Sequence, residues 1–535
     1  MRQFVEKLQQ RPHLVLSACC LALVLVMASV TSVNLALEDI AVDLKASGAD
    51  LTWIADAYTV ALAALVLTFG AFGDDFGRRR ALVIGTLVFG VAATLAALTT
   101  SVSMLIFWRA VMGVGAAMIM PSTLSTITAV FPADQRPRAV AIWAGFASAG
   151  AVIGLLMSGA LLEFFSWEST FFAIAALAAV SLLATLLCVP NTHSTEEVRP
   201  DLFGSLLTAV GIGALVYGII EGADKGWGET LPVVSYVVAV VALTLWAIRD
   251  SRIRLPILDP RLFKLRGLSS GTLTLVLLFL GAFGFFYVGL QYVQLVLGFG
   301  PLTAALAFLP IAAVVMPLSA LTPWLGERLG DKAIMAGGLF LMAVSLLLVT
   351  RLDAESGYVS FLIPMLVFAA GLAISSTPST NVVVASLPAT KQGVASALND
   401  VTRETGAALG IALLGSLFTS GYSDAVAPAT TQLPAGAAAA VEDSAAGGLH
   451  VAASPKLGEA GAVLEQQVRE SFMTGMHDAF LVGAIVLLVG IAYVLLRAPG
   501  KGAVPEGEAE DALGLAGERR LPHSPGDGRR RRAAV

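Results

Sequence analysis

The chain has 535 residues, of which 57% are hydrophobic and only 13% are charged, and its formal net charge is −5. Soluble domains average about 45–50% apolar and about 25% charged residues, so a water-soluble fold would have no place for this much apolar surface. The composition therefore excludes a soluble globular protein and indicates a chain that crosses a membrane several times.

Cysteine and histidine give no sign of a metal site. Cys19, Cys20 and Cys188 lie in apolar runs, which supports neither a disulfide framework nor a thiolate site, and the five histidines fall at segment ends, in loops or in the tail. Since no nucleotide loop, metal-ligand spacing or nucleophile constellation is present either, we expect no enzyme activity and no cofactor. Protons that cross the membrane must then be carried by carboxylates, with the proton gradient as the energy source.

The N-terminal segment resembles a signal peptide, because a basic stretch up to Arg11 precedes an apolar run from about Leu14 to Leu37. The run is too long for a signal peptide and lacks a small-residue cleavage site, so we expect a retained first span. A bilayer core needs about 20 apolar residues per helix. Fourteen segments meet this requirement, at about 13–37, 51–72, 81–99, 104–131, 139–164, 170–190, 202–222, 233–250, 268–298, 301–325, 334–350, 361–387, 394–422 and 477–499.

The basic residues test this threading, because cytoplasmic loops carry an excess of Lys and Arg. With the N-terminus inside, 26 of the 33 Lys and Arg residues fall on the cytoplasmic side and five fall outside. The other two, Arg109 and Arg403, lie within spans. One helix more or fewer would move the basic residues of all later loops to the opposite side of the membrane. The sequence therefore predicts fourteen spans with both the N- and C-termini cytoplasmic.

A pattern of glycine, an acid, two residues and glycine occurs twice, at Gly73 after the second span and at Gly326 after the tenth, 253 residues later. Two six-helix halves with two spans inserted between them would give this offset. Parallel halves are a known transporter architecture, with the substrate site between them. We therefore predict an all-α polytopic membrane protein with six-helix bundles at 1–200 and 268–499, two inserted helices at 201–250 and a cytoplasmic linker at 251–267.

Two stretches are expected outside the membrane. Residues 423–476 are rich in Ala, Gly, Ser and Pro, become helix-compatible near Glu459 and form the predicted extracellular loop. Residues 500–535 form a cytoplasmic tail, predicted to be disordered, that ends in four arginines. We interpret these arginines as an anchor to anionic lipid rather than a nucleic-acid site.

The turn after the second span carries the densest motif, Gly70-Ala71-Phe72-Gly73-Asp74-Asp75-Phe76-Gly77-Arg78-Arg79-Arg80. Its glycines permit a tight turn and close helix approach. An acid beside several arginines can latch against charged or helix-terminal groups across the cytoplasmic seam. A merely basic loop would explain the arginines but neither the glycines nor Asp74. We interpret the segment as a gating motif, with a second copy at Glu327 and Gly330.

This motif resembles the signature between the second and third helices of the major facilitator superfamily. Essentially the whole chain is similar to the fourteen-span drug:proton antiporters of that superfamily, which include exporters of quaternary ammonium compounds. The resemblance implies the major facilitator fold and proton-coupled export. Asp75 stands where the family usually has a basic residue, which implies a weaker latch.

Arg109 lies inside the fourth span, where an unpaired arginine costs several kcal/mol. It matches the superfamily's intramembrane arginine, which is implicated in proton coupling, and the alternative is an arginine that snorkels to the interface. Asp56 lies at a similar depth in the second span, judged by a rise of about 1.5 Å per residue. Asp56 is a candidate for binding a proton or cation, or alternatively for a structural ion pair with Arg109.

Three ionisable residues share the thirteenth span: Asp400, Arg403 and Glu404. The two acids are four residues apart and lie on one helical face. Charged groups in a span are expensive and indicate function, and such a cluster can be poised to exchange protons. In the quaternary-ammonium exporters, a membrane-embedded acid aligns with Asp400. The alternative is a self-neutralised pair of Arg403 with one of the acids that holds helices together.

Glycines of the fifth span resemble the superfamily's antiporter motif; they are Gly150, Gly154 and Gly159. Leu155 stands where that motif has proline, so the kink that proline causes is lost, whereas small residues still allow close packing. Related exporters also carry acids at positions aligned with Ser29 and Val315. Fewer buried acids argue against a dedicated exporter of dications.

Aromatic and amide side chains of the ninth span form a possible substrate surface, because aromatic faces suit planar or cationic molecules. The alternative is that these aromatics face lipid. The candidates, with one amide of the first span, are Asn34, Phe285, Phe286, Tyr287, Gln291, Tyr292 and Gln294.

The sequence therefore predicts a multi-pass protein of the cell (inner) membrane that exports amphipathic small molecules, drugs or antibiotics in exchange for protons. Its expected partners are a small-molecule substrate, protons and membrane lipid, without nucleic acid, and we expect a monomer. Two alternatives remain open: a lipid or metabolite transporter or symporter of the same fold, and a sensor or scaffold that no longer moves substrate.

Overall fold

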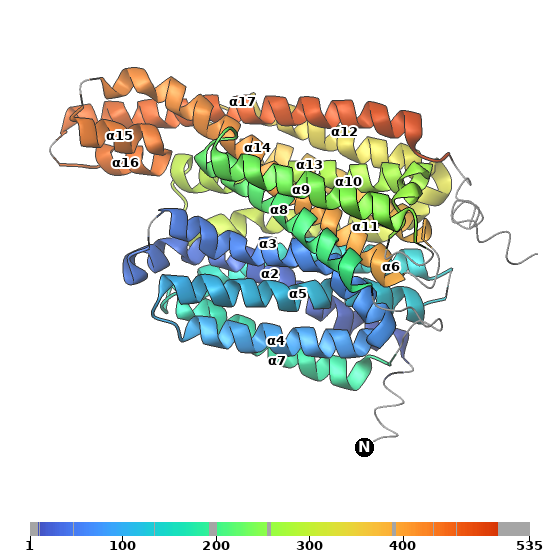
Figure 1. Cartoon of the computed structure of the whole chain (residues 1–535). Helices are drawn as coiled ribbons and strands as arrows, with labels where there is room; N and C mark the ends of the chain where they lie inside the picture. Colours follow the sequence, from blue (N-terminus) through green and yellow to red (C-terminus); the bar gives the residue numbers. More distant parts are fainter. Residues whose placement is uncertain are drawn as a thin grey trace, which may run out of the picture.

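The computed structural model describes residues 9, 11–46, 48–132, 134–191, 201–253, 258–387, 392–431, 433–455 and 457–500. Most of these residues are helical (Figure 1), and fourteen helices among them are long and apolar enough to cross a membrane, which confirms the predicted number of spans. These helices are α2 (Pro12–Leu44), α3 (Gly48–Phe76), α4 (Arg78–Ala97), α5 (Val102–Val130), α6 (Arg136–Leu162), α7 (Glu168–Cys188), α8 (Leu202–Lys225), α9 (Thr230–Asp250), α10 (Arg266–Gln291), α11 (Pro301–Leu329), α12 (Asp331–Val349), α13 (Tyr358–Ala385), α14 (Gln392–Thr430) and α17 (Glu459–Arg497).

Four shorter elements complete the described part of the chain. A 3-10 helix, η1 (Pro260–Lys264), precedes α10, and a π-helical turn, η2 (Tyr292–Val296), continues it. Two short helices, α15 (Ala435–Asp443) and α16 (Ala445–Ala452), lie between α14 and α17.

Glycine forms the two turns of the repeated motif. Gly77 separates α3 from α4 with a φ of 104°, and Gly330 separates α11 from α12 with a φ of 82°. Side chains other than hydrogen disfavour this backbone region, so both turns require glycine. The repeated sequence pattern thus corresponds to a repeated turn.

Two groups of six helices build the molecule. Helices α2 to α7 pack together around one hydrophobic core, and α10 to α14 with α17 surround most of a second. The groups meet where α3 packs against α14 and α6 packs against α11. The inserted pair lies beside them, with α8 against α3 and α14 and with α9 mainly against α8 (Figure 1). This is the predicted all-α architecture, while the residue boundaries of the domains stay a prediction.

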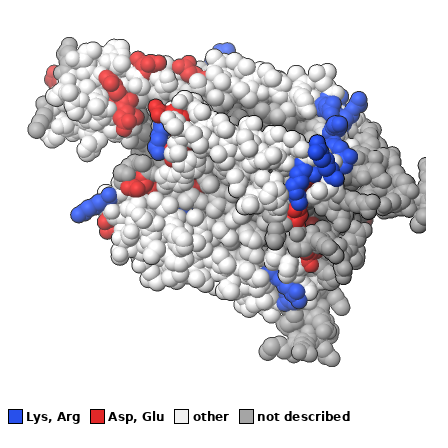
Figure 2. All heavy atoms as spheres, in the orientation of Figure 1, with Lys and Arg blue, Asp and Glu red and all other residues white. Residues whose placement is uncertain are grey.

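Charge separates along the helix bundle. Figure 2 shows most Lys and Arg of the visible face at one end and most Asp and Glu at the other, each with a few residues of the opposite sign, and a nearly uncharged belt between them. We call the first the basic end, which holds Arg78–Arg80, Arg136, Arg138 and Lys332, and the second the acidic end, which holds Asp353, Glu355, Glu442 and Glu465. The belt is the surface that a bilayer would cover. That the basic end faces the cytoplasm stays a prediction of the positive-inside rule.

The predicted loop at 423–476 is largely helical. Helix α14 continues to Thr430, and α17 already begins at Glu459, so both helices extend past the ends that hydropathy predicted. With α15 and α16 they form a helical cap at the acidic end (Figure 1). The Tyr422 hydroxyl donates a 2.7 Å hydrogen bond to the carbonyl of Val441, and the buried Phe472 packs edge-on against Phe418. A hydropathy window ends a span where apolar residues thin out, whereas an alanine-rich backbone continues the helix.

Candidate functional site

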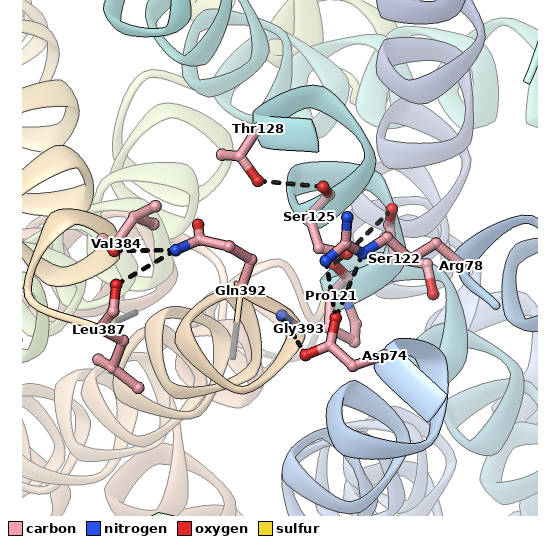
Figure 3. A network of polar contacts seen from close by, with 10 residues as sticks. All are labelled: Asp74, Arg78, Pro121, Ser122, Ser125, Thr128, Val384, Leu387, Gln392 and Gly393. Atoms are coloured by element: carbon pink, nitrogen blue, oxygen red, sulfur yellow. Dashed lines mark hydrogen bonds and ion pairs between the residues drawn. The ribbon is translucent and has the colours of Figure 1, made fainter. Parts of the chain in front are cut away.

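Asp74 joins the two six-helix groups at the basic end. One carboxylate oxygen accepts hydrogen bonds from Nε and Nη2 of Arg78, at 3.2 and 2.9 Å, within the α3–α4 turn. The other accepts a 2.7 Å hydrogen bond from the backbone N–H of Gly393, at the start of α14 in the other group (Figure 3). The carboxylate is buried, and the first turn of a helix has unpaired N–H groups that attract an anion. This contact holds the groups together at the basic end.

The helices meet closely at this point because both carry glycine. A Cβ added to Gly70 would lie 2.5 Å from Cβ of Ala397 and 2.6 Å from the carbonyl oxygen of Gly393. By contrast, a Cβ on Gly73 would lie 3.4 Å from its nearest neighbour, the Ser122 hydroxyl, which is ordinary contact. The close approach that the sequence predicted thus depends on Gly70. We call Gly70, Asp74, Arg78 and Gly393 the basic-end junction.

Two neighbouring segments border the junction. Hydroxyl groups of α5 face the junction (Figure 3). The Ser125 hydroxyl donates a 2.7 Å hydrogen bond to the carbonyl of Pro121, and the Thr128 hydroxyl donates a 3.0 Å hydrogen bond to the carbonyl of Ser125. Both hydroxyl groups are therefore hydrogen-bonded within their own helix. On the other side, Gln392 donates to the carbonyl of Leu387 at 3.3 Å and closes the turn that leads into α14.

The remaining residues of the gating motif have separate roles. Arg79 donates a 2.7 Å hydrogen bond to the carbonyl of Leu186 at the end of α7, and Arg80 is exposed. In the second copy of the motif, Gly330 forms the turn, but Glu327 is exposed and makes no hydrogen bond or ion pair within the described residues. The structure therefore shows one engaged copy, at Asp74, and one disengaged copy, at Glu327.

Arg109 is buried between α5, α3 and α2. Its guanidinium donates to the carbonyls of Ile54 at 2.8 Å and Ala55 at 3.2 Å, and to the hydroxyl of Ser29 at 3.3 Å. Its Cζ also lies 4.7 Å from the ring centroid of Tyr58. Asp56 follows these two carbonyls in α3, is half-buried and acts electrostatically on the guanidinium. The structure thus brings Arg109 and Asp56 into one region, together with Ser29 of α2.

The ionisable cluster of α14 lies in the interior between the two groups. Asp400, Arg403 and Glu404 have 0%, 5% and 8% of their surface exposed, so none of them faces the lipid belt. Asn399 donates a 3.4 Å hydrogen bond to Asp400 and accepts a 3.0 Å hydrogen bond from the hydroxyl of Thr380 in α13. Oδ2 of Asp400 has no hydrogen-bond partner within the described residues.

The guanidinium of Arg403 lies against aromatic rings and forms no close ion pair with the two carboxylates of its own helix within the described residues. Its Cζ lies 4.5 Å from the ring centroid of Phe279 in α10 and 5.5 Å from that of Trp143 in α6. Within the described residues it forms no hydrogen bond or salt bridge with Asp400 or Glu404. Both carboxylates still act electrostatically on Arg403, so the self-neutralised cluster considered from the sequence stays an open alternative.

The glycines of the predicted antiporter motif pack α6 against α2. A Cβ on Gly154 would lie 2.4 Å from the carbonyl oxygen of Ala28, and one on Gly150 would lie 2.9 Å from Cβ of Met27. The Thr31 hydroxyl donates to the carbonyl of Ala151 at 2.8 Å, and the Ser158 hydroxyl donates to that of Ser32 at the same distance. The third glycine, Gly159, lies on the same helix and is also buried. These contacts fix two helices of the first group without the proline of the family pattern.

The predicted substrate surface separates into two sets. Phe285 and Tyr292 belong to the core of the second group: Phe285 stacks on Phe368 at 4.3 Å between centroids, and the Tyr292 hydroxyl donates to the carbonyl of Ser356. Phe286, Gln291 and Gln294 are half-buried, and Asn34 and Tyr287 are exposed. The structure therefore does not gather the seven residues at one surface, and Phe285 and Tyr292 pack inside the bundle.

Sequence reasoning missed four residues that the site uses: Gly393, Tyr58, Trp143 and Phe279. Gly393 could have been found as the start of the thirteenth span, since a latch on a helix terminus needs a terminus across the seam. A tryptophan inside a span needs a partner for its N–H, and Trp143 finds one in the Thr123 hydroxyl at 3.1 Å. Nothing in the sequence pairs Tyr58 or Phe279 with an arginine.

Comparison with known proteins gives these features a context. The family model described as Major Facilitator Superfamily matches residues 19–411. The chain is 34% identical to the multidrug efflux pump LfrA of Mycolicibacterium smegmatis. The aligned 490 residues cover 90% of this chain and 96% of that protein. The chain is also 30% identical over 516 residues to the tetracenomycin C resistance and export protein of Streptomyces glaucescens, covering 94% and 96%.

Solved structures share the arrangement of helices. The structure of the proton:xylose symporter XylE is similar with a TM-score of 0.62 and 14% identity, covering 94% of this chain and 99% of that chain. The human organic anion transporter MFSD10 is similar with a TM-score of 0.60 and 13% identity, covering 90% and 99%. At such identities the likeness concerns the fold alone.

Proposed function

Because the chain belongs to the Major Facilitator Superfamily, we propose that it is a multi-pass exporter of the cell membrane that moves amphipathic small molecules outward in exchange for protons. The observation that carries this proposal is the similarity over nine-tenths of the chain to a protein named as a multidrug efflux pump. A second relative of nearly full length is named as an export protein. Substrate, protons and lipid are then its partners.

Alternating access follows from the basic-end junction. With Asp74 bound to Gly393, α3 and α14 are closed against each other, so a substrate cannot enter from the basic end. Opening that end requires the charge-assisted hydrogen bond from Gly393 to Asp74 to break, and such a bond contributes about 1.5–3 kcal/mol. The junction therefore acts as a latch that favours the state closed at the basic end.

Protons and substrate compete for the buried carboxylates in this mechanism. Asp400 and Glu404 lie between the two groups, where either end could expose them in turn. Neutralisation by a proton or by a substrate cation would lower the cost of keeping these charges away from water. Asp56 is the third carboxylate proposed to bind a proton or substrate cation. Arg109 fixes this part of α3 by donating hydrogen bonds to the carbonyls of Ile54 and Ala55.

Transport under an imposed pH gradient tests the proposal. The purified chain is reconstituted into proteoliposomes, and uptake of monocationic, dicationic and neutral amphiphiles is followed with an acidic or a basic lumen. A proton antiporter accumulates substrate in an acidic lumen, whereas a symporter accumulates it when the gradient is reversed. If no compound of the panel moved under either gradient, export would be refuted, and a sensor or scaffold function would be favoured instead.

A further inference from the structure

The guanidinium of Arg403 lies close to two aromatic rings that belong to different halves of the molecule, with Cζ 4.5 Å from one ring centroid and 5.5 Å from the other. Phe279 is on α10 of the second group, and Trp143 is on α6 of the first group. Trp143 is fully buried, and its N–H donates to the Thr123 hydroxyl, so the ring has a fixed orientation. The two rings therefore form a preorganised place for a positive charge, where the ring faces attract a cation.

One oxygen of a carboxylate one helical turn away, Oδ2 of Asp400, has no hydrogen-bond partner within the described residues. Asp400 precedes Arg403 by three residues, a spacing at which acids and arginines readily pair along a helix. Even so, Oδ2 of Asp400 is buried without a hydrogen bond in the described part of the chain. A buried acceptor without a donor is costly. Arg403 thus has two competing partners, the aromatic pair and Asp400, and this structure shows it on the aromatic pair.

We propose that Trp143 and Phe279 bind the positive charge of the exported molecule, and that Arg403 occupies this place as a tethered substitute until a substrate cation displaces it onto Asp400. The inference rests on the proposed function and names its substrate class. The substrate is an amphipathic monocation with delocalised or shielded charge, since such ions lose less hydration than compact ammonium groups when they lie against rings.

Displacement of Arg403 couples the two fluxes. A guanidinium beside Asp400 stabilises the ionised carboxylate, so a proton held there leaves for water as the cation arrives, and the total charge of the site is unchanged. The other titratable group that acts on Asp400 and Arg403 is Glu404 on the same helix, which in turn acts on Tyr58 of α3. Arg109 and Asp56 act on each other beyond Tyr58. Asp56 and Arg109 carry opposite charges, so the cluster of α14 decides the balance.

Binding and proton release by the purified full-length chain in lipid nanodiscs test this inference. Tetraphenylphosphonium is the probe, and a pH-sensitive dye in weak buffer records protons released. Arg403→Gln removes the tethered cation, so it should bind the probe about tenfold more tightly, which is the scale of one desolvated cation–π contact, and release no proton on binding. Trp143→Leu should weaken binding at least about tenfold with or without Arg403→Gln, whereas Trp143→Phe keeps most of it.

A second tryptophan provides a matched control. The ring centroid of Trp324 lies 4.1 Å from Cζ of Arg328, but Trp324 is exposed on α11, so Trp324→Leu removes a similar contact away from the site and should leave binding unchanged. Equal or weaker binding by Arg403→Gln would overturn the inference, as would wild-type binding by Trp143→Leu. If Arg403→Gln does not fold, Phe279→Leu decides: weakened binding supports the inference, and unchanged binding overturns it. A wild-type chain that exports nothing sinks the proposed function instead.

Discussion

The carboxylate of Asp74 accepts a 2.7 Å hydrogen bond from the backbone N–H of Gly393, which lies 319 residues later in the chain. These residues belong to different helix groups, so this contact is broken whenever the basic end opens. Arg78 holds the other oxygen of the same carboxylate and keeps it aimed across the junction. A substitution that removes this one hydrogen bond should therefore alter access from the basic end.

Asp74→Asn should shift the protein towards the state open at the basic end. The amide keeps the shape but loses the charge, which weakens hydrogen bonds worth about 1.5–3 kcal/mol and shifts the equilibrium about tenfold or more. A cysteine introduced at Ser125 in a background without the native cysteines reports this opening through its rate of labelling by an impermeant maleimide. Asp75→Asn is the matched control, because Asp75 forms no hydrogen bond or ion pair within the described residues. Equal labelling of both variants would show that the latch is unimportant.

Gly70→Ala should open the same junction by steric means. The added methyl would lie 2.5 Å from Ala397 and 2.6 Å from the Gly393 carbonyl, so α3 and α14 must move apart. Overpacking of this kind costs about 1–3 kcal/mol. We expect faster maleimide labelling at the Ser125→Cys position and slower export. Gly73→Ala places its methyl 3.4 Å from the nearest atom and should behave like wild type. If Gly73→Ala had the larger effect, close approach at Gly70 would not explain the motif.

The sequence predicts the turn of this junction but not the residue that the turn contacts. The spacing of Gly73, Asp74 and Gly77 predicts a tight turn and an acid that latches on a helix terminus. It does not identify Gly393 as the terminus, because that depends on how two distant helices pack. The second copy shows the same limit: Glu327 has the same sequence pattern, but its side chain is exposed in this state. A motif predicts a turn well and its long-range partner poorly.

Gly154→Ala should lower the thermal stability of the protein. Its methyl would lie 2.4 Å from the carbonyl oxygen of Ala28 and would force α6 from α2, at a cost of about 1–3 kcal/mol. Unfolding of purified protein in detergent, followed by tryptophan fluorescence, measures the shift. Gly145→Ala lies on the same helix with its nearest atom at 3.7 Å, so it should melt at the wild-type temperature. Indistinguishable melting of the two variants would contradict close packing at Gly154.

The ion pair between Asp201 and Arg249 gives a prediction about pH. It joins the basic ends of α8 and α9 at 2.7 Å. Burial alone would raise the pKa of the Asp201 carboxyl, but hydrogen bonds from Arg249 and the Gly204 N–H outweigh it and hold this pKa below its usual range. The stabilisation is therefore complete above the ordinary carboxyl pKa of about 3.9 and is lost only below it.

Asp201→Asn should accordingly destabilise the protein by the same amount throughout the range from about pH 5 to 8, in which proton coupling is assayed. Thermal unfolding of the variant and the wild type at several pH values measures this difference. A difference that vanished at the acidic end of the range would mean that Asp201 titrates there and would contradict the assignment. The constant offset also makes Asp201→Asn a control for variants whose transport changes with pH.

The cluster of α14 shows a similar division between sequence and structure. The four-residue spacing of Asp400 and Glu404 places them on one helical face, and their burial away from lipid follows from their charge. Contacts of Arg403 could not be predicted, because its aromatic neighbours come from α6 and α10 and their distances depend on tertiary packing. Hydropathy likewise gave all fourteen spans, and the sequence predicted helix from about Glu459, but α15, α16 and the extension of α14 to Thr430 were not predicted.

Proton-coupled export through the buried carboxylates of α14 is tested most directly by measuring substrate and proton flux in the same proteoliposomes. Wild-type protein with an acidic lumen should accumulate an amphipathic monocation while protons leave the lumen, and dissipating the gradient should stop both fluxes. Asp400→Asn should abolish the coupled movement while the protein stays folded, because the charge shared by proton and substrate is gone. Unchanged substrate flux and unchanged proton release in Asp400→Asn would contradict this mechanism.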